Sequence, residues 1–392
     1  MRFLHTSDWH LGKPLRHLRR DREFEDVLQE ILDVARMERV DCLLMAGDLF
    51  DSMAPPPEAE RMAFEFFREL YGAGIQAVVI AGNHDHQRRL TAFGRVLDLV
   101  GIHVRAEPSR EGAVVGIRGR DGEEAAVAVL PWVPERQVRT WEAMRGERME
   151  SFQQYADVVA ELLVDLERSL PRNVVRIIMA HLFVDGGIVG GEGAGERPLH
   201  LGQVYAVKPQ RLPMVDYMAL GHLHRPQAIR PRPPVYYSGS ILQLDFGEVG
   251  QRKCIYLVDV SPGKEAQVEE VPLTKPRPLY DLGSPRTPLT PEELRAEVKA
   301  RGDELAQGYV RVFLRAEGLS HSLMEEVRRA IPTAVEVKVI APRPKQEARP
   351  SVRELSPIEL FTLYHRQEHG GDPPDELVRL FQELMQEVHE AP

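Results

Sequence analysis

Five short apolar segments of the sequence end in side chains that can bind a metal ion or move a proton. The clearest is the run at 78–81, which is followed after one glycine by Asn83, His84 and Asp85. The other four segments are followed by Asp8 and His10, by Asp48, by His181, and by His222 and His224. Carboxylate, amide and imidazole groups bind divalent metal ions, and imidazole is also an effective general acid near neutral pH. The set therefore predicts a metal centre with proton chemistry beside it.

The types and number of these side chains indicate the metal chemistry. Residues two apart in an extended segment point to the same side, so Asp8 with His10, and His222 with His224, can each direct two ligands at one centre. The set has oxygen and imidazole ligands and no cysteine, which suits manganese, iron or zinc and is unlike a structural zinc site. Without His84 and Asp85 the set still has seven ligands. That is more than one ion needs, so we predict two ions. Paired ions lie about 3.5–4 Å apart and hold the attacking and leaving oxygens of a phosphoryl displacement.

The segments that carry these side chains alternate between strand and helix patterns. Short strand-like runs predict strands at 2–7, 42–46, 78–81, 125–130, 174–180, 217–220, 236–240 and 254–258. Between the first two strands, apolar residues recur at helical spacing, namely Phe24, Val27, Leu28, Ile31 and Leu32. This alternation predicts an α/β fold with parallel strands and right-handed crossovers. Because parallel strands present their carboxyl ends at one edge, the candidate ligands should meet there.

Proline-rich segments divide the rest of the chain. Prolines recur between 272 and 291 and again between 342 and 350, which is typical of linkers. A capping box that can start a helix lies near each, at Thr290–Glu293 and at Ser356–Glu359. We therefore predict a catalytic domain at 1–272, a small α/β domain at 273–342, a linker at 343–354 and two amphipathic helices at 355–392.

The composition is that of an ordinary globular protein of 392 residues, 43% hydrophobic and 28% charged. The formal net charge of -10 argues against attraction of the whole molecule to nucleic acid, although it leaves room for a local basic surface. The sequence has no signal-peptide pattern and no apolar run of about 20 residues. Cys42 and Cys254 lie in apolar runs and are expected to be buried and reduced. These features predict a cytoplasmic protein.

In chain order, the candidate ligands stand in motifs that resemble those of the calcineurin-like metallophosphoesterases. The motifs are Asp8-x-His10, Gly47-Asp48, Gly82-Asn83-His84-Asp85, His181 and Gly221-His222-x-His224. The longer phrases at 5–12, 47–52, 180–184 and 219–226 resemble the nuclease branch of this superfamily, which acts in DNA double-strand-break repair. The resemblance implies a β-sandwich flanked by helices, a small domain that caps bound DNA, and C-terminal helices that dock on the coiled coil of an ABC-type ATPase.

The resemblance also implies a role for each metal ligand. One ion would be held by Asp8, His10, Asp48 and His224, and the second by Asp48, Asn83, His181 and His222. Asp48 would bridge the two ions. Manganese is the metal that this branch of the superfamily implies, with magnesium, iron and zinc as alternatives.

His84 would be the catalytic histidine that binds no metal and contacts the scissile phosphate. Eukaryotic and archaeal relatives can carry a second histidine where this chain has Asp51. Because aspartate cannot donate a proton as imidazolium does at neutral pH, this departure argues against a two-histidine mechanism. Asp85 could cap the following helix or orient His84, and we predict that it orients His84 and takes part in catalysis.

The resemblance implies a 3′-to-5′ double-strand exonuclease and single-strand or hairpin endonuclease, working as a homodimer within a heterotetramer with the ATPase. A basic segment follows the first strand and contains Lys13, Arg16, Arg19, Arg20 and Arg22. By itself it could be a solvated helix start, but beside a phosphodiesterase centre we expect it to contact DNA phosphates. Two other functions are compatible with the fold: a phosphatase for small molecules or proteins, and a scaffold without catalysis. The scaffold predicts missing ligands, and none is missing.

Overall fold

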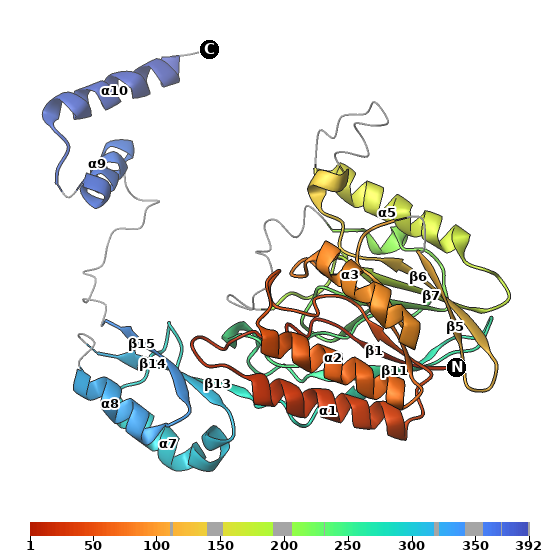
Figure 1. Ribbon diagram of the computed structural model, residues 1–392. Helices are drawn as coiled ribbons and strands as arrows, with labels where there is room; N and C mark the ends of the chain where they lie inside the picture. The colour runs from red at the N-terminus through yellow and green to blue at the C-terminus, as the bar shows by residue number, and fades with distance from the viewer. Residues whose placement is uncertain are drawn as a thin grey trace. The chain divides into compact units, whose positions relative to one another are not determined.

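The computed structural model describes residues 1–109, 113–138, 152–190, 206–230, 232–316, 321–341, 356–369 and 371–390 (Figure 1). These residues fall into two units, Met1–Ile340 and Ala341–Pro392. The first unit contains two six-stranded sheets and one three-stranded sheet. The predicted linker at 343–354 lies outside the described residues.

The first sheet carries three of the five ligand-bearing segments. Its strand order is β12-β11-β1-β2-β3-β4, and its strands are β1 Arg2–Thr6, β2 Cys42–Met45, β3 Gln76–Ile80, β4 Ile102–Arg105, β11 Cys254–Asp259 and β12 Gln267–Pro272. Strands β1 to β4 are parallel, as predicted, and β11 and β12 are added antiparallel. The connecting helices are α1 Asp21–Met37, α2 Pro57–Gly72 and α3 Gln87–Leu97, the last followed by the 3-10 turn η1 Asp98–Val100.

The second sheet carries the other two ligand-bearing segments. Its order is β5-β6-β7-β8-β10-β9, with β5 Val114–Arg118, β6 Glu124–Leu130, β7 Val175–His181, β8 Tyr217–Gly221, β9 Gln227–Arg230 and β10 Val235–Tyr237. Strands β6, β7, β8 and β10 are parallel, and β5 and β9 close the edges antiparallel. Helix α5 Phe152–Ser169 and the 3-10 turns η3 Pro209–Arg211 and η4 Phe246–Glu248 complete this part.

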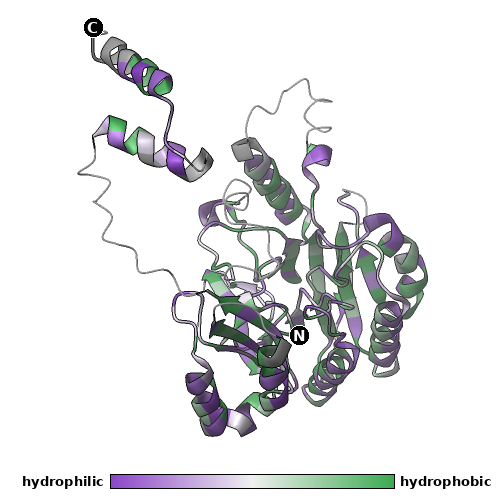
Figure 2. Cartoon of the chain, turned by 90° about the vertical axis from the view of Figure 1, so that its left-hand side faces the viewer, coloured by the Kyte–Doolittle hydropathy of each residue, from purple (hydrophilic) through white to green (hydrophobic). Residues whose placement is uncertain are grey.

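The two sheets stack face to face, and helices cover their outer faces. Alternation along β1 shows the layering, because Phe3 points between the sheets with Val127 while Leu4 packs against α1 with Phe24. On the far side, Leu163 of α5 belongs to the core that covers the second sheet. Figure 1 shows α1, α2 and α3 over the first sheet and α5 over the second. Because both faces of the central strands are covered, strands such as β2, β3 and β8 are fully buried and apolar, which Figure 2 shows as green strands.

The small domain is a parallel three-stranded sheet with two helices. Its elements are β13 Leu279–Leu282, α7 Pro291–Ala306, β14 Tyr309–Arg315, α8 His321–Ala330 and β15 Ala334–Ile340. The capping box at the start of α7 is confirmed, since Thr290 Oγ1 accepts the Glu293 N–H at 3.2 Å and the Glu293 carboxylate accepts the Thr290 N–H at 2.8 Å.

The second unit contains helices α9 Pro357–His369 and α10 Asp375–Glu390. The predicted capping box is present here too, because Ser356 Oγ accepts the Glu359 N–H at 3.4 Å while the Glu359 carboxylate accepts the Ser356 N–H at 2.7 Å. The rings of Phe361 and Phe381 stack at 4.3 Å and join the two helices. No helix in the described part of the chain is long and apolar enough to cross a bilayer.

Candidate metal centre

The seven predicted metal ligands meet at one edge of the sandwich. Five strands deliver them, and each of the seven lies at or just beyond the carboxyl end of β1, β2, β3, β7 or β8. Donor atoms lie within 4.8 Å of one another in three groups, Asp8/His10/His224, His10/Asp48/His84 and Asp8/Asp48/His181. The expectation that parallel strands bring these residues to a common edge is confirmed, with the qualification that the edge is shared by two stacked sheets.

Asp48 lies at the middle of the site. Its Oδ2 atom is 3.5 Å from His10 Nε2 on one side and 3.5 Å from His181 Nε2 on the other. Two ligands of one ion are about 3 Å apart when each metal–ligand bond is about 2.1 Å, so both spacings suit an ion between the atoms. Asp48 Oδ1 accepts the backbone N–H of His84 at 2.8 Å, which fixes the carboxylate. This geometry suits a bridging ligand.

Asn83 lies next to two further predicted ligands, His181 and His222. Its Oδ1 atom lies 3.2 Å from His181 Nε2 and 3.0 Å from His222 Nδ1. The backbone N–H of His222 donates to the Asp8 carboxylate at 3.0 Å, which links this group to the other half of the site. The arrangement therefore brings together both ligand sets that the resemblance implies.

His10 supports the presence of an ion most directly. Its side chain is 1% exposed, yet neither of its ring nitrogens has a hydrogen-bond partner among the residues that the structure describes. Carboxylate oxygens of Asp48 and Asp51 lie 3.5 Å and 3.4 Å from these nitrogens, too far and too poorly aligned for a hydrogen bond. Buried polar atoms almost always have a partner, and a metal ion supplies one for an imidazole nitrogen. The donor set of carboxylates, one amide oxygen and imidazoles also suits a divalent ion, so the residues present fit the metal centre.

The backbone of the ligands is strained in a way that points them inward. Six non-glycine residues in the described part of the chain have positive φ, and four of them are predicted ligands: Asp8 (50°), His10 (48°), Asp48 (53°) and His222 (110°). Each such conformation costs about 1–3 kcal/mol and persists where the surrounding structure holds it, which is common at functional sites.

Two motif glycines let the strand ends approach one another. A Cβ atom at Gly82 would lie 2.1 Å from Asp48 Oδ1, and one at Gly221 would lie 1.9 Å from the Ala46 carbonyl oxygen. Both distances are far inside van der Waals contact. The glycines of the Gly-Asn-His-Asp and Gly-His-x-His motifs are therefore needed for space around the ligands.

Three residues that the sequence analysis did not identify support the ligands. Glu248 Oε1 lies 2.9 Å from His224 Nδ1, and Lys253 Nζ lies 2.6 Å from Glu248 Oε2. A carboxylate on one ring nitrogen of a histidine leaves the other for a metal. The Trp132 ring stacks on His222 at 5.4 Å. None of the three follows a ligand-bearing strand, so the strand-end pattern could not find them.

The prediction that Asp85 orients the His84 ring is wrong. The Asp85 carboxylate is buried and accepts three backbone N–H groups, from Leu49 at 3.1 Å, from Phe50 at 2.9 Å and from Gly82 at 2.9 Å. These contacts tie the loop after β2 to the loop after β3. His84 Nδ1 instead lies 2.8 Å from the main-chain carbonyl of Asp51, which orients the ring.

The predicted DNA contacts in the basic segment need one correction. Arg20 is 3% exposed, and it donates to Glu23 at 2.7 Å and to the Gln243 carbonyl at 2.6 Å, so phosphate cannot reach it. Arg16 is bound to Asp245 at 2.7 Å. Lys13 is bound to Asp51 at 2.7 Å, whereas Arg19 remains 58% exposed and Arg22 is exposed.

The pKa of each of the ligand side chains His181, Asp48 and His10 depends on the balance between burial and the neighbouring charges. Burial lowers the pKa of His181, but the carboxylates of Asp48 and Asp8 outweigh it and raise that pKa to about 9. Burial raises the pKa of Asp48, yet His181 and His10 hold it well below its usual range. Burial lowers the pKa of His10 to about 4. A proton on His181 thus supplies part of the charge that a cation would bring.

Metal affinity is therefore expected to rise with pH. Since the pKa of His181 is about 9, this ring is protonated at neutral pH and must lose its proton to bind an ion. The apparent association constant should increase by up to about tenfold per pH unit between about pH 6 and about pH 8. Manganese titrations at several pH values would measure the slope, and a flat profile would contradict the assignment of His181 as a ligand.

Residues 1–226 match the model of the calcineurin-like phosphoesterase family. The SbcD component of the SbcCD nuclease of Bacillus subtilis is 33% identical to this chain over 396 residues, covering 100% of the chain and 99% of the relative. The SbcD protein of Rhodobacter capsulatus is 33% identical over 314 residues, covering 76% and 75%. That of Escherichia coli K12 is 33% identical over 300 residues, covering 72% of each.

The chain belongs to the SbcD family of calcineurin-like phosphoesterases. This membership makes it a hydrolase of ester bonds that uses divalent metal ions.

Proposed function

We propose that this chain is a manganese-dependent DNA nuclease with 3′-to-5′ double-strand exonuclease and single-strand or hairpin endonuclease activity. It would act in the processing, repair and recombination of broken DNA. The observation that carries the proposal is the complete ligand set around Asp48 with His84 placed beside it. The relatives named as components of a nuclease support DNA as the substrate.

The chemistry follows from how these residues are held. Two bound ions neutralise a phosphodiester and lower the pKa of a bound water. The same seven residues would hold those ions in the two sets that share Asp48. His84 Nδ1 donates to the Asp51 carbonyl at 2.8 Å, so Nε2 carries a proton only in the imidazolium form. In that form Nε2 can donate the proton to the leaving oxygen. Arg19 and Arg22 would contact the backbone phosphates of the DNA.

The test is a cleavage assay on end-labelled duplex, hairpin and single-stranded DNA with manganese, magnesium and zinc. Turnover of nucleotide monoesters is measured in parallel. We expect manganese-dependent cleavage of DNA and much slower release of phosphate from monoesters. Release of phosphate without DNA cleavage would favour the phosphatase alternative instead.

The C-terminal helices would dock on an SbcC-type ABC ATPase. Helices α9 and α10 pack through Phe361 and Phe381 and leave apolar side chains exposed, among them Tyr364 (59%), Leu380 (50%) and Leu384 (51%). An amphipathic helix pair with an exposed apolar face suits the groove of a partner coiled coil. In such an assembly two copies of each protein would form a heterotetramer.

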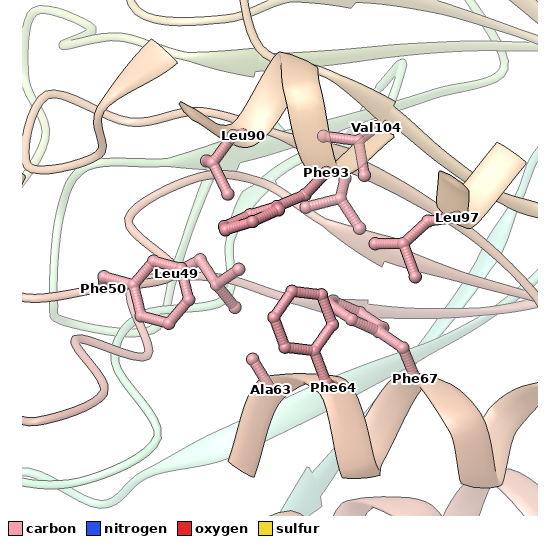
Figure 3. Close-up of a pocket in the computed structure, with 10 residues that line it drawn as sticks. Leu49, Phe50, Ala63, Phe64, Phe67, Leu90, Phe93, Leu97 and Val104 are labelled. Carbon is pink, nitrogen blue, oxygen red and sulfur yellow. The ribbon is translucent and has the colours of Figure 1, made fainter. Parts of the chain in front are cut away.

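A second copy of this chain would cover the outer face of α2 and α3. Val96 of α3 and Leu99 of η1 are 68% and 84% exposed, and Phe64 of α2 is 37% exposed. Figure 3 shows Phe64 of α2 and Phe93 of α3 among the apolar side chains that line a small pocket. The pocket of about 10 Å³ holds one water at most and offers no polar side chain, so it does not suit a substrate.

This face also carries charges of both signs, because Glu60 of α2 pairs with Arg89 of α3. A surface that is apolar with mixed charge can pair with its own copy around a twofold axis.

Charged residues on this face should therefore prevent dimer formation. Replacing Val96 and Leu99 together by glutamate buries unpaired like charges in the interface, so we expect a monomer. Light scattering after gel filtration should give twice the chain mass of 44.4 kDa for the wild type and the single mass for the variant. The control is Met214→Glu, which is 64% exposed next to the second sheet. A dimeric double variant would show that the interface lies elsewhere.

A further inference from the structure

Glu248 is a fully buried carboxylate whose two oxygens both have partners. Its Oε1 atom lies 2.9 Å from Nδ1 of the ligand His224. Its Oε2 atom accepts the ammonium of Lys253 at 2.6 Å and the backbone N–H of Leu244 at 3.2 Å. The carboxylate is therefore fixed on one side by the protein and faces a metal ligand on the other.

Lys253 binds the main chain of the same ligand, His224. Lys253 is 3% exposed, and its ammonium donates to the His224 carbonyl at 2.8 Å and to Ser240 Oγ at 2.8 Å. The Glu248–Lys253 pair thus holds both the ring and the backbone of His224. A neutral imidazole that donates from Nδ1 to a carboxylate leaves Nε2 as the atom that binds metal.

The residues just before Glu248 contact the small domain. Gln243 Oε1 accepts the Leu279 N–H at 2.6 Å. The guanidinium of Arg311 lies 4.7 Å from the centre of the Phe246 ring, and Leu279 and Val335 pack in the same cluster as that ring.

The basic segment joins this contact. Arg16 bridges Asp245, at 2.7 Å, and Glu336 of β15, at 3.1 Å. Since Arg16 binds one carboxylate on each side, it ties the segment before Glu248 to the small domain.

A short rigid turn connects these contacts to Glu248. Residues Phe246–Glu248 form the 3-10 turn η4, and the Glu248 N–H donates to the Asp245 carbonyl at 2.9 Å. Asp245 and Phe246 lie within three residues of Glu248 in this turn, so we expect a movement of either residue to move Glu248 as well.

We propose that the segment 243–248 couples the small domain to the metal centre, with Glu248 as the positioning residue of His224. The small domain contacts Gln243 and Phe246 near the start of the segment. Glu248 at its end sets the orientation and tautomer of the His224 ring. This inference rests on the metal-dependent function proposed above. It assigns to the small domain an influence on the occupancy of the ion that His224 helps to hold.

The test measures manganese binding to the purified full chain without DNA, for three single variants. In Glu248→Gln the single amide oxygen can accept a hydrogen bond from His224 Nδ1 or from the Lys253 ammonium, but not from both. We expect one of the two manganese sites to weaken by about 10–100-fold and the other to remain within about twofold. Arg311→Ala removes the contact between the Arg311 guanidinium and the Phe246 ring. In this variant the manganese affinity of the same site should fall by about three- to tenfold.

The matched control is Arg295→Ala. Arg295 forms an ion pair with Glu326 at 2.6 Å within the small domain and lies on α7. Manganese binding should be unchanged in this variant. If Arg295→Ala and Arg311→Ala weaken binding equally, general damage to the small domain explains the effect and the coupling is overturned.

A double variant, Glu248→Leu with Lys253→Met, guards against a folding defect, because it leaves no unpaired buried charge and no acceptor for His224 Nδ1. Selective loss of one site should persist in it, whereas recovery of that site would overturn the positioning role. Unchanged affinity in Glu248→Gln would overturn it as well. DNA cleavage by the wild type is measured separately. If the wild type fails to cleave DNA while Glu248→Gln selectively loses one manganese site, the proposed function is refuted and this inference stands.

Discussion

Replacing His84 by alanine should abolish manganese-dependent DNA cleavage and leave both metal sites filled. The His84 ring is held by the Asp51 carbonyl at 2.8 Å, and a donor atom of the ring lies within 4.8 Å of donor atoms of His10 and Asp48. It belongs to neither of the two ligand sets that we propose, so we expect its loss to remove a proton donor and no ligand. General acid catalysis of this kind contributes about 10²–10⁴-fold, and the cleavage rate should fall by that factor. Cleavage of labelled duplex and the metal content of the same preparation are the two measurements.

The neighbouring histidine provides the matched control. His86 is exposed, and its Nδ1 atom accepts the Arg89 N–H at 3.3 Å at the start of α3, away from the ligands. His86→Ala should cleave DNA at close to the wild-type rate. A wild-type rate in His84→Ala would remove His84 from the mechanism, and loss of metal in that variant would instead make it a ligand.

Replacing Asp48 by asparagine should empty both metal sites together. Asp48 Oδ2 lies 3.5 Å from a residue of each proposed ligand set, His10 and His181, and the amide carries no charge to share between two ions. The amide oxygen still accepts the His84 N–H, so the fold should be kept. Metal content after dialysis should drop from about two ions to none, and cleavage should be lost with it.

Asp33→Asn is the control for this second experiment, because Asp33 is exposed on α1 and bound only to Gln29 among the interactions of the described residues. It should retain both ions and full activity. Two ions bound to Asp48→Asn with normal affinity would show that Asp48 does not bridge, and one ion would assign Asp48 to a single set.

The sequence was sufficient where the deciding interactions are local or periodic. The runs at 42–46 and 78–81 became β2 and β3, and the capping box at Thr290 formed as predicted. Both depend on residues within a few positions of one another. The predicted ligands lie close together for a related reason. Parallel strands end at a common edge, so residue types at five strand ends were enough to predict a candidate metal centre there.

Only the tertiary structure decided the roles of residues whose partners are distant in the chain. Asp85 was assigned to its neighbour His84, but its carboxylate binds the backbone of Leu49 and Phe50. Arg20 looked like a phosphate contact, but it is buried against Gln243, which lies 223 positions away. No local pattern encodes such a pairing.

Glu248 is the clearest case. Its sequence neighbourhood gives no sign of a metal site, and its role comes from a contact of 2.9 Å with a histidine 24 positions earlier. Residue type and periodicity thus determined which side chains this protein brings to its reactive edge. The packing of the two sheets and the small domain decided which groups hold them there, because a buried polar atom must find its partner in space wherever that partner lies in the chain.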